Sequence, residues 1–504
     1  MLHRTPMNTT PSESGRPLAR ATARAVAWSY LSWFLAKALV LAPTAVLARL
    51  LTPDEFGVVG FATVVVAYLT VLRDLGLGGA LTQRRDDIED AADTVFVVNL
   101  LLGVLLALFT AILAPWVAGY FEDPRITSLL RVLGLTFVIQ SLGTTHLVLL
   151  QRDLAFSRKL IPDVGQSAVR MLVSIAAAAG GLGIWALVIG QVAGVAASTA
   201  LAWVVLPWRP RMRLTRRLLG PLTRFGAPLL GVDIVHAIAG NLDYLIVGKV
   251  LGATALGVYT LAYRLPELFL LGVVTVLSRA LFPALASVQE DLDRLRSGFL
   301  ETIRYVQMAV VPVGLGLMVA ADPIVRVALG DDWLDVVPVV RILAAFALLS
   351  SSMVADGDVY KAMGRPIVLA RIAFFKLVLL VPALLVGVRH GLVGIALAHL
   401  GTTAVVKSLR AIVVVRVLGI RYSELGRCFL STAAAGAVMV AAVIPALMAT
   451  TAQPPIVRLT IAVGVGAVAY LVVIVALEHG ALRRLGGLFQ SIDQAPPTRT
   501  DMRG

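Results

Sequence analysis

The sequence predicts an all-α integral membrane protein with about fourteen transmembrane helices. Of its 504 residues, 58% are hydrophobic and only 15% are charged, whereas an average soluble domain is roughly 25% charged. The hydrophobic residues fall in successive runs, each long enough to cross a hydrocarbon core, which takes about 20 mostly apolar residues. The net charge of +14 comes from bases that lie in alternate loops between these runs. This distribution favours a positive-inside membrane protein over one that binds nucleic acid.

The apolar runs follow a polar N-terminal tail. Residues 1–25 are rich in Arg, Ser, Thr and Pro, which predicts a disordered cytoplasmic tail. The run at 26–50 is too long for the apolar core of a signal peptide, so we expect it to be retained as the first helix. The remaining apolar segments lie near 57–80, 94–118, 128–150, 161–180 and 184–206, then near 226–248, 255–282, 305–328, 337–360, 366–388 and 391–417, and finally near 429–449 and 456–477.

Loop charges set the predicted orientation. Bases recur on the side of the N-terminal tail, and the opposite loops hold few bases and often carry acids. Because basic loops stay in the cytoplasm, both termini are predicted to be cytoplasmic. The cytoplasmic bases include Arg24, Arg84, Arg152, Lys159, Arg213, Arg217, Arg294, Arg365, Arg427 and Arg484, and the charges of the opposite side include Asp54, Glu122, Asp123, Arg125, Arg326, Asp331 and Arg389.

The two largest hydrophilic inserts are both predicted to be cytoplasmic. Residues 207–224 form a basic linker between two halves of the chain. Residues 287–304 read SVQEDLDRLRSGFLETIR, which predicts a short amphipathic helix lying at the inner interface. The external loops are all short, so we expect no soluble domain that could hold a catalytic site.

An ungapped internal echo indicates that the two halves are similar. The segment RLLTPDEFGV at 49–58 lines up with KVLGATALGV at 249–258. Each copy has a base that ends one apolar run, a short turn, and a Gly-Val pair that begins the next run. A weaker echo pairs Gly183 with Gly394. Two similar halves, with buried charge where the second begins, is a layout of many secondary transporters.

Motifs for several kinds of chemistry are missing from the sequence. It contains no G-x-x-x-x-G-K-[ST] for a nucleotide and no H-E-x-x-H or paired-cysteine motif for a metal. We therefore expect no cofactor, no metal and no enzymatic activity. The single cysteine, Cys428, is interpreted as a small membrane-facing side chain. The acidic pair Asp331 and Asp332 could serve a membrane enzyme but fits a solvated external turn better.

Charged side chains within the apolar runs are the remaining candidates for a functional site. Such groups are costly at membrane depth and tend to face a bundle interior or a water-filled cavity. Asp233 and His236 are three residues apart and can share one helix face. With Asp243, they are our candidates for a proton- or cation-responsive coupling site. Asp163 and Arg170 are two turns apart, also on one face.

Among the bases, Arg264 and Lys37 are predicted to lie deepest. Arg264 is about nine residues into its apolar segment, or roughly 13 Å at about 1.5 Å per residue, and Lys37 lies at a similar depth in the first helix. Arg264 either faces a cavity or neutralises Glu267 on its own helix. Arg371 and Arg410 lie nearer the cytoplasmic ends, so we interpret them as snorkelling.

Two blocks resemble a known family. LARLLTPDEFGVVGFATVVVAYLTVLRDLGLGGALTQR (47–84) resembles the opening of polysaccharide flippases of the Wzx/WzxC type, and GNLDYLIVGKVLGATALGVYTLAYRL (240–265) is similar to the matching segment of their second half. The resemblance covers about residues 20–480. It implies membership of the multidrug/oligosaccharidyl-lipid/polysaccharide exporter superfamily.

The resemblance implies two six-helix lobes in a V-shape around a central cavity, followed by two extra C-terminal helices. The N-lobe is expected at 26–206, the C-lobe at 225–417, the extra helices within 428–477, and a cytoplasmic tail at 478–504. These parts would work by alternating access.

The resemblance also implies a substrate and its surroundings. The expected substrate is an undecaprenyl-diphosphate-linked oligosaccharide, exported across a bacterial inner membrane. Membrane lipids, and the polymerase and glycosyltransferases of the same pathway, are the expected partners. The family's cavity is typically cationic, which matches Lys37 and Arg264, and Arg170 is the third candidate substrate-binding base.

Three alternatives stay open. A drug/cation antiporter of the same architecture would favour an acidic, aromatic-lined cavity, and the surplus of buried bases counts against it. A flippase for a peptidoglycan precursor is a second alternative, although the two blocks look closer to the exopolysaccharide type. A membrane glycan polymerase or ligase would need a large external loop with catalytic groups.

Overall fold

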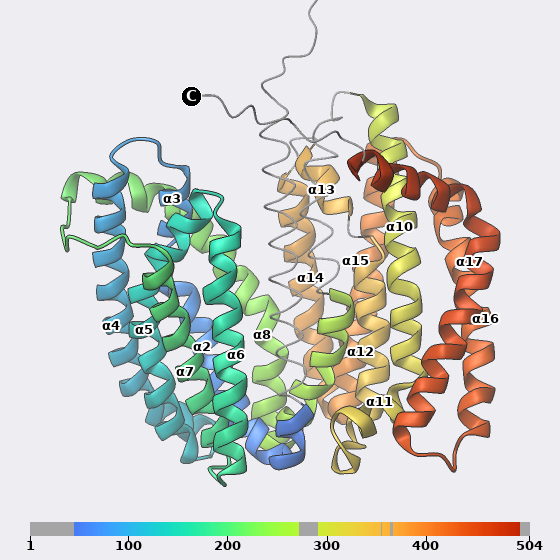
Figure 1. The fold of residues 1–504 in the computed structure, drawn as a ribbon, viewed down its shortest axis with the longest axis horizontal. Helices are drawn as coiled ribbons and strands as arrows, with labels where there is room; N and C mark the ends of the chain where they lie inside the picture. The colour runs from blue at the N-terminus through green and yellow to red at the C-terminus, as the bar shows by residue number, and fades with distance from the viewer. Residues whose placement is uncertain (1–44, 272–290, 354, 363–365, 494–504) are drawn as a thin grey trace, which may run out of the picture. The chain divides into compact units, whose positions relative to one another are not determined.

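Helices form every regular element in the part of the chain that the structure describes. The computed structural model describes residues 45–271, 291–353, 355–362 and 366–493 (Figure 1). The chain divides into two compact units, Met1–Thr260 and Leu261–Gly504. The predicted all-α fold class is confirmed. The predicted lobe boundaries stay a prediction.

In the first unit, helices that follow one another in the chain pack side by side. α4 packs along α5, and α6 along α7. At Gly190 and Gly194 of α7, an added Cβ would collide with the α6 backbone or side chains, so these small residues permit the close approach. The helices are α2 (Pro53–Asp74), α3 (Leu77–Gln83), α4 (Ile88–Phe121), α5 (Arg125–Arg152), α6 (Phe156–Ala179), α7 (Trp185–Val205) and α8 (Arg216–Pro266), the last of which runs into the second unit.

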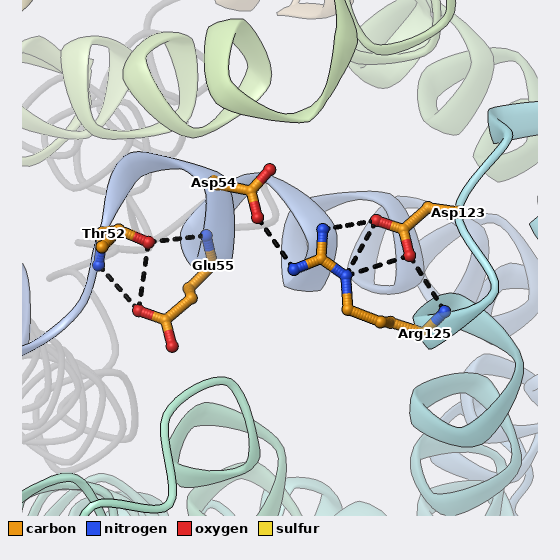
Figure 2. Close-up of polar contacts among 5 residues, drawn as sticks. All are labelled: Thr52, Asp54, Glu55, Asp123 and Arg125. Carbon is orange, nitrogen blue, oxygen red and sulfur yellow. Dashed lines mark hydrogen bonds and ion pairs between the residues drawn. The ribbon is translucent and has the colours of Figure 1, made fainter.

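The start of α2 is fixed by its local sequence. The Thr52 hydroxyl accepts a hydrogen bond from the Glu55 N–H at 3.3 Å, and the Glu55 carboxylate accepts one from the Thr52 N–H at 2.8 Å (Figure 2). This capping box satisfies two backbone donors that otherwise lack a helical partner. Pro53 follows at the first helical position, where a missing N–H has little consequence.

Two bases tie other elements to the turn between α4 and α5. Arg125 donates to Asp54 of α2 at 2.8 Å and to Asp123 of the turn at 2.6 Å (Figure 2), and Lys249 of α8 donates to Glu122 at 3.0 Å. The hydrogen bond from Arg125 holds the pKa of Asp123 below its usual range. The Arg125–Asp123 ion pair is therefore complete at neutral pH, and it is lost as the pH falls through the lowered pKa of Asp123.

A kink at Gly252 divides α8 into two helices. Gly252 has φ 85° and ψ −179°, a backbone conformation essentially confined to glycine. The 51-residue α8 therefore contains the predicted segment 226–248 and the start of the segment 255–282. The rest of that second segment, beyond residue 271, lies outside the described residues.

The two copies of the internal echo contact each other in the first unit. A Cβ added to Gly57 of α2 would lie well inside 3.0 Å of the Ala253 carbonyl oxygen, and one added to Gly257 would lie equally close to the Pro53 carbonyl oxygen. Positions 53 and 57 correspond to 253 and 257 in the echo, so the contact is reciprocal, as in a two-fold interface. The echo therefore marks a helix crossing where the backbones touch, which glycine permits.

The predicted linker 207–224 is partly helical. α8 begins inside it at Arg216, and Leu218 and Leu222 are buried in a core with residues of α3 and α4. Upstream, the Arg211 N–H donates to Asp93 of α4 at 3.0 Å. Apolar burial and backbone hydrogen bonding thus hold this basic segment against the first unit.

Two hydrophobic cores lie among the described residues of the second unit. One gathers residues of α10, α13, α14, α15 and α16 and includes Cys428, which is 2% exposed. The interpretation of Cys428 as membrane-facing was wrong, because its thiol packs inside the helix bundle. The other core joins α10 to α16 and α17. The elements are η1 (Glu267–Leu271), α10 (Leu292–Val319), α11 (Ala321–Ala328), η2 (Asp331–Trp333), α12 (Val336–Ser351), α13 (Ala355–Ala362), α14 (Pro366–Gly387), η3 (Val388–His390), α15 (Gly391–Leu418), α16 (Tyr422–Ala449) and α17 (Pro455–Asp493).

The described part of the segment 287–304 does not form a separate interfacial helix. From Leu292 it is the first part of α10, which continues without a break to Val319. Leu295, Phe299 and Ile303 are all buried in the first of the two cores. The amphipathic pattern was real, but its apolar face packs against neighbouring helices instead of lipid.

The helix count agrees with about fourteen crossings. Nine described segments are long and apolar enough to span a membrane, and one of these, Arg371–Leu418, covers both α14 and α15. The kinked α8 covers one predicted segment and the start of the next, and α6 and α12 are further helices at predicted positions. α6 is too charged and α12 too short to count among the nine.

Candidate functional site

Only some of the predicted site residues can be placed. Lys37 lies outside the described residues. Asp233 and His236 are on helical turns of α8, but their side chains are also outside the described part. Arg170, Asp243 and Arg264 are described with their side chains. Arg170 lies on α6, and Asp243 and Arg264 lie on α8 on either side of the kink at Gly252.

Asp243 is a buried carboxylate beside the kink in α8. It is 3% exposed, and the Tyr259 hydroxyl donates to its Oδ2 at 2.6 Å. Tyr259 follows Gly252 and Asp243 precedes it, so the kink brings the two side chains together. The ring of Tyr244 packs edge-on against the ring of Tyr259, with the two ring centroids 5.3 Å apart. Ionisable side chains within spanning helices are often functional, so Asp243 stays a candidate for the coupling site.

Arg170 lies on α6 where that helix meets α7. A Cβ added to Gly194 would come within 2.8 Å of the Arg170 Cβ, so the two helices are in close contact there. Arg170 has an interaction partner of its own. Asp163 forms its ion pair with Lys159, one turn away, at 3.8 Å.

Arg264 is half-buried near the end of α8. It lies twelve residues beyond Gly252, or about 18 Å along the helix at about 1.5 Å per residue, so it is deep for a base. Within the described residues Arg264 makes no ion pair. Pro266 and the π-helical turn Glu267–Leu271 follow directly. Such turns widen a helix locally and are frequent at functional sites.

A second buried charge cluster joins α13 to α15 in the second unit. Arg410 Nε lies 3.1 Å from Asp356 Oδ2, and Asp356 is 1% exposed. The Tyr360 hydroxyl donates to the Arg410 carbonyl oxygen at 3.3 Å. The interpretation of Arg410 as snorkelling was therefore wrong, since a buried carboxylate on another helix draws the guanidinium inward.

Lys407 adds a further base to this cluster. It is 8% exposed and lies one turn before Arg410 on α15. Within the described residues it makes no hydrogen bond or ion pair, although Asp356 and Arg410 are near enough to act on its charge. The cluster thus holds two bases and one acid and attracts anions. In the sequence, its members are visible only as charges within two separate apolar runs, Asp356 in one and Lys407 with Arg410 in another.

A comparison with known protein families identifies the family of this chain. Residues 46–338 match the family described as polysaccharide biosynthesis protein, and this match spans more than half of the sequence. The chain belongs to this family. The resemblance inferred from the two sequence blocks is confirmed, because both blocks lie within the matched residues.

Family relatives match over most of their length. The lipopolysaccharide biosynthesis protein WzxC of Escherichia coli K12 is 26% identical over 415 residues, covering 81% of this chain and 84% of WzxC. The teichuronic acid biosynthesis protein TuaB of Bacillus subtilis is 28% identical over 357 residues, covering 69% of this chain and 72% of TuaB. A solved structure of the lipid II flippase MurJ matches with a TM-score of 0.73 at 14% identity, covering 91% of this chain and 100% of MurJ. That likeness shows a shared fold.

Proposed function

We propose that this chain translocates undecaprenyl-diphosphate-linked oligosaccharide units across a bacterial inner membrane by alternating access, for exopolysaccharide, capsule or O-antigen synthesis. The family match over residues 46–338 carries the proposal. It is supported by the long matches to relatives that are named for polysaccharide biosynthesis. We expect the polymerase and glycosyltransferases of the same pathway to act on the same substrate.

Buried bases explain how such a substrate could cross. A diphosphate cannot pass through hydrocarbon bare, because desolvating its charge is prohibitive. Half-buried Arg264, which has no ion-pair partner among the described residues, is our first candidate for the group that replaces its hydration. Lys37 and Arg170 remain candidates from the sequence, and buried Lys407 joins them from the structure. The prenyl tail stays in lipid throughout.

The function is tested by deleting the gene from its own organism. We expect surface polymer to be lost while the lipid-linked unit accumulates in the inner membrane, and both changes to be reversed by the intact gene. Surface polymer is measured by composition analysis of washed cells and the lipid-linked unit by mass spectrometry of extracts. Normal polymer together with increased sensitivity to cationic drugs would instead support the antiporter, and lysis on depletion would support the peptidoglycan-precursor flippase.

Topology can be checked with reporter fusions. Because the bases alternate between loops, fusions at Arg24, Arg213, Arg294 and the C-terminus should report a cytoplasmic location, and a fusion at Asp331 an external one. The measurement is paired alkaline phosphatase and fluorescent-protein activity at each site. An external signal at the C-terminus would mean an odd number of crossings and contradict the proposed orientation.

Coupling is predicted to depend on Asp243. We expect no nucleotide hydrolysis, so uphill transport needs an ion gradient or downstream consumption of the substrate. Asp243→Asn keeps the size of the side chain but removes its ability to exchange a proton, so transport driven by an imposed gradient should fall at least tenfold, as for a loss of about 1.4 kcal/mol.

The Asp243 experiment uses proteoliposomes with a pH or sodium gradient imposed in turn. Tyr259→Phe is the matched variant, since it leaves the carboxylate in place and removes only its hydrogen-bond donor. We expect it to change the pH dependence with a smaller loss of rate. Transport by the native protein that is indifferent to both gradients would show that this residue does not couple an ion.

A further inference from the structure

A cavity of about 570 Å³ lies in the second unit. Its lining comes from the ends of α10 and α16, the starts of α12 and α17, and α11, helices that are labelled in Figure 1. Loop charges predict this end of the unit to be external. The lining is mostly apolar but includes Asp322, Arg341 and Arg458. Its volume is within the range of sites for small organic ligands, about 300–1,000 Å³.

The charged residues that line this cavity carry a net positive charge. Arg458 Nη1 lies 3.2 Å from Asp322 Oδ2, and Arg326 Nε lies 3.1 Å from Asp322 Oδ1. Both carboxylate oxygens are therefore engaged. Arg341 makes no ion pair within the described residues, and the buried Nε of Arg458 has no hydrogen-bond partner there. Both guanidinium groups therefore retain N–H donors that could hydrogen-bond to an anion.

The mouth of the cavity suits a lipid better than a soluble anion. Ile444 and Met448 of α16 line it and are 44% and 71% exposed. In a helix that spans a membrane, apolar side chains this exposed contact hydrocarbon. An anion that enters past them needs an apolar body of its own.

A second cavity lies along earlier turns of two of the same helices, α10 and α16. It has a volume of about 600 Å³ and is lined by residues of earlier turns of α16 and α10, among them Val440, Gly436 and Leu315. The first cavity begins at the next turns, with Ile444 on α16 and Val319 on α10. The first cavity thus offers charged groups, and the second offers a mostly apolar stretch along the same two helices.

We propose that this pair of cavities binds an anionic phospholipid of the surrounding membrane, with its phosphate between Arg341 and Arg458 and an acyl chain along α10 and α16. Guanidinium groups match phosphate oxygens with paired hydrogen bonds, and basic pockets between transmembrane helices bind lipid head groups. The bound lipid would join α12 to the C-terminal pair α16 and α17, and so stabilise the second unit.

The test uses the purified full-length protein in detergent, with native mass spectrometry and thermal unfolding as readouts. Phosphatidylglycerol should remain bound and raise the Tm, and phosphatidylcholine with the same acyl chains should do so far less. Arg341→Gln should weaken phosphatidylglycerol binding at least tenfold, as for loss of one hydrogen bond to a charged group. Arg389→Gln removes an exposed base on the same predicted side, away from the cavity, and should have no effect.

Arg341 is the primary variant because it has no ion pair to lose, and Leu447→Trp, which fills the cavity, is a second route if Arg341→Gln does not fold. Equal binding of phosphatidylcholine, or unchanged binding by both variants, overturns the proposal. So does equal stabilisation by inorganic phosphate alone. A prenyl diphosphate could also displace phosphatidylglycerol, with binding that depends more strongly on Arg341. In that case the cavity belongs to a path for the carrier lipid, and the phospholipid assignment is wrong.

Discussion

Arg264→Ala should abolish polymer export while the protein still inserts at normal levels. Removing one partner of a desolvated charge pair costs about 2–5 kcal/mol, which corresponds to a fall in transport of roughly 100-fold for 3 kcal/mol. The guanidinium stays charged at any working pH and presents a planar fork of donors to a diphosphate. Arg264→Lys keeps the charge but loses the fork, so it should recover only part of the activity.

The measurement is surface polymer per copy of membrane-inserted protein, with Arg416→Ala as the control for removing an exposed base from the same unit. Glu267→Gln separates a binding role from a structural one. If Arg264 binds substrate, Glu267→Gln should be milder than Arg264→Ala. Full export by Arg264→Ala at normal protein levels would remove this residue from the site.

Gly57→Ala should destabilise the first unit far more than an alanine placed at a helical glycine that has open space around it. The added methyl would overlap the Ala253 carbonyl oxygen, and a backbone atom cannot rotate away. Overpacking usually costs about 1–3 kcal/mol, and we expect the upper end or more at this site. Gly257→Ala should behave alike, because its methyl would meet the Pro53 carbonyl oxygen.

The glycine prediction is checked by thermal unfolding of the purified full-length variants. Gly401→Ala in α15 is the matched control, since an added Cβ there meets nothing within 4 Å, and it should be neutral or stabilising by up to about 1 kcal/mol. The double variant Gly57→Ala/Gly257→Ala should lose less stability than the two single variants added together, because both methyl groups push apart the same two helices at one crossing. Equal stability of Gly57→Ala and Gly401→Ala would contradict the close backbone contact.

The sequence alone predicted the number of crossings and several of their ends. Hydropathy depends on composition over about 20 neighbouring residues, so it is readable without tertiary contacts. The start of α2 is equally local, since Thr52, Pro53 and Glu55 satisfy the backbone donors between them. The echo of 49–58 in 249–258 could be found for the same reason, and its two blocks led to the family that the comparison confirmed.

The sequence did not show which faces and charges would meet. The amphipathic pattern of 287–304 was compatible with lipid or with protein, and only the packing of Leu295 and Phe299 in the second unit decided between them. Periodicity identifies an apolar face but not what covers it.

Tertiary structure alone brought the buried charges together. Asp356 and Arg410 lie on separate helices, more than fifty residues apart, and became an ion pair only when α13 packed near α15. Asp243 found its donor in Tyr259 because Gly252 folds one helix back on itself. Hydropathy determines which segments leave water, but the partner of a buried charge depends on where those segments then pack, and that geometry is not encoded within any single segment.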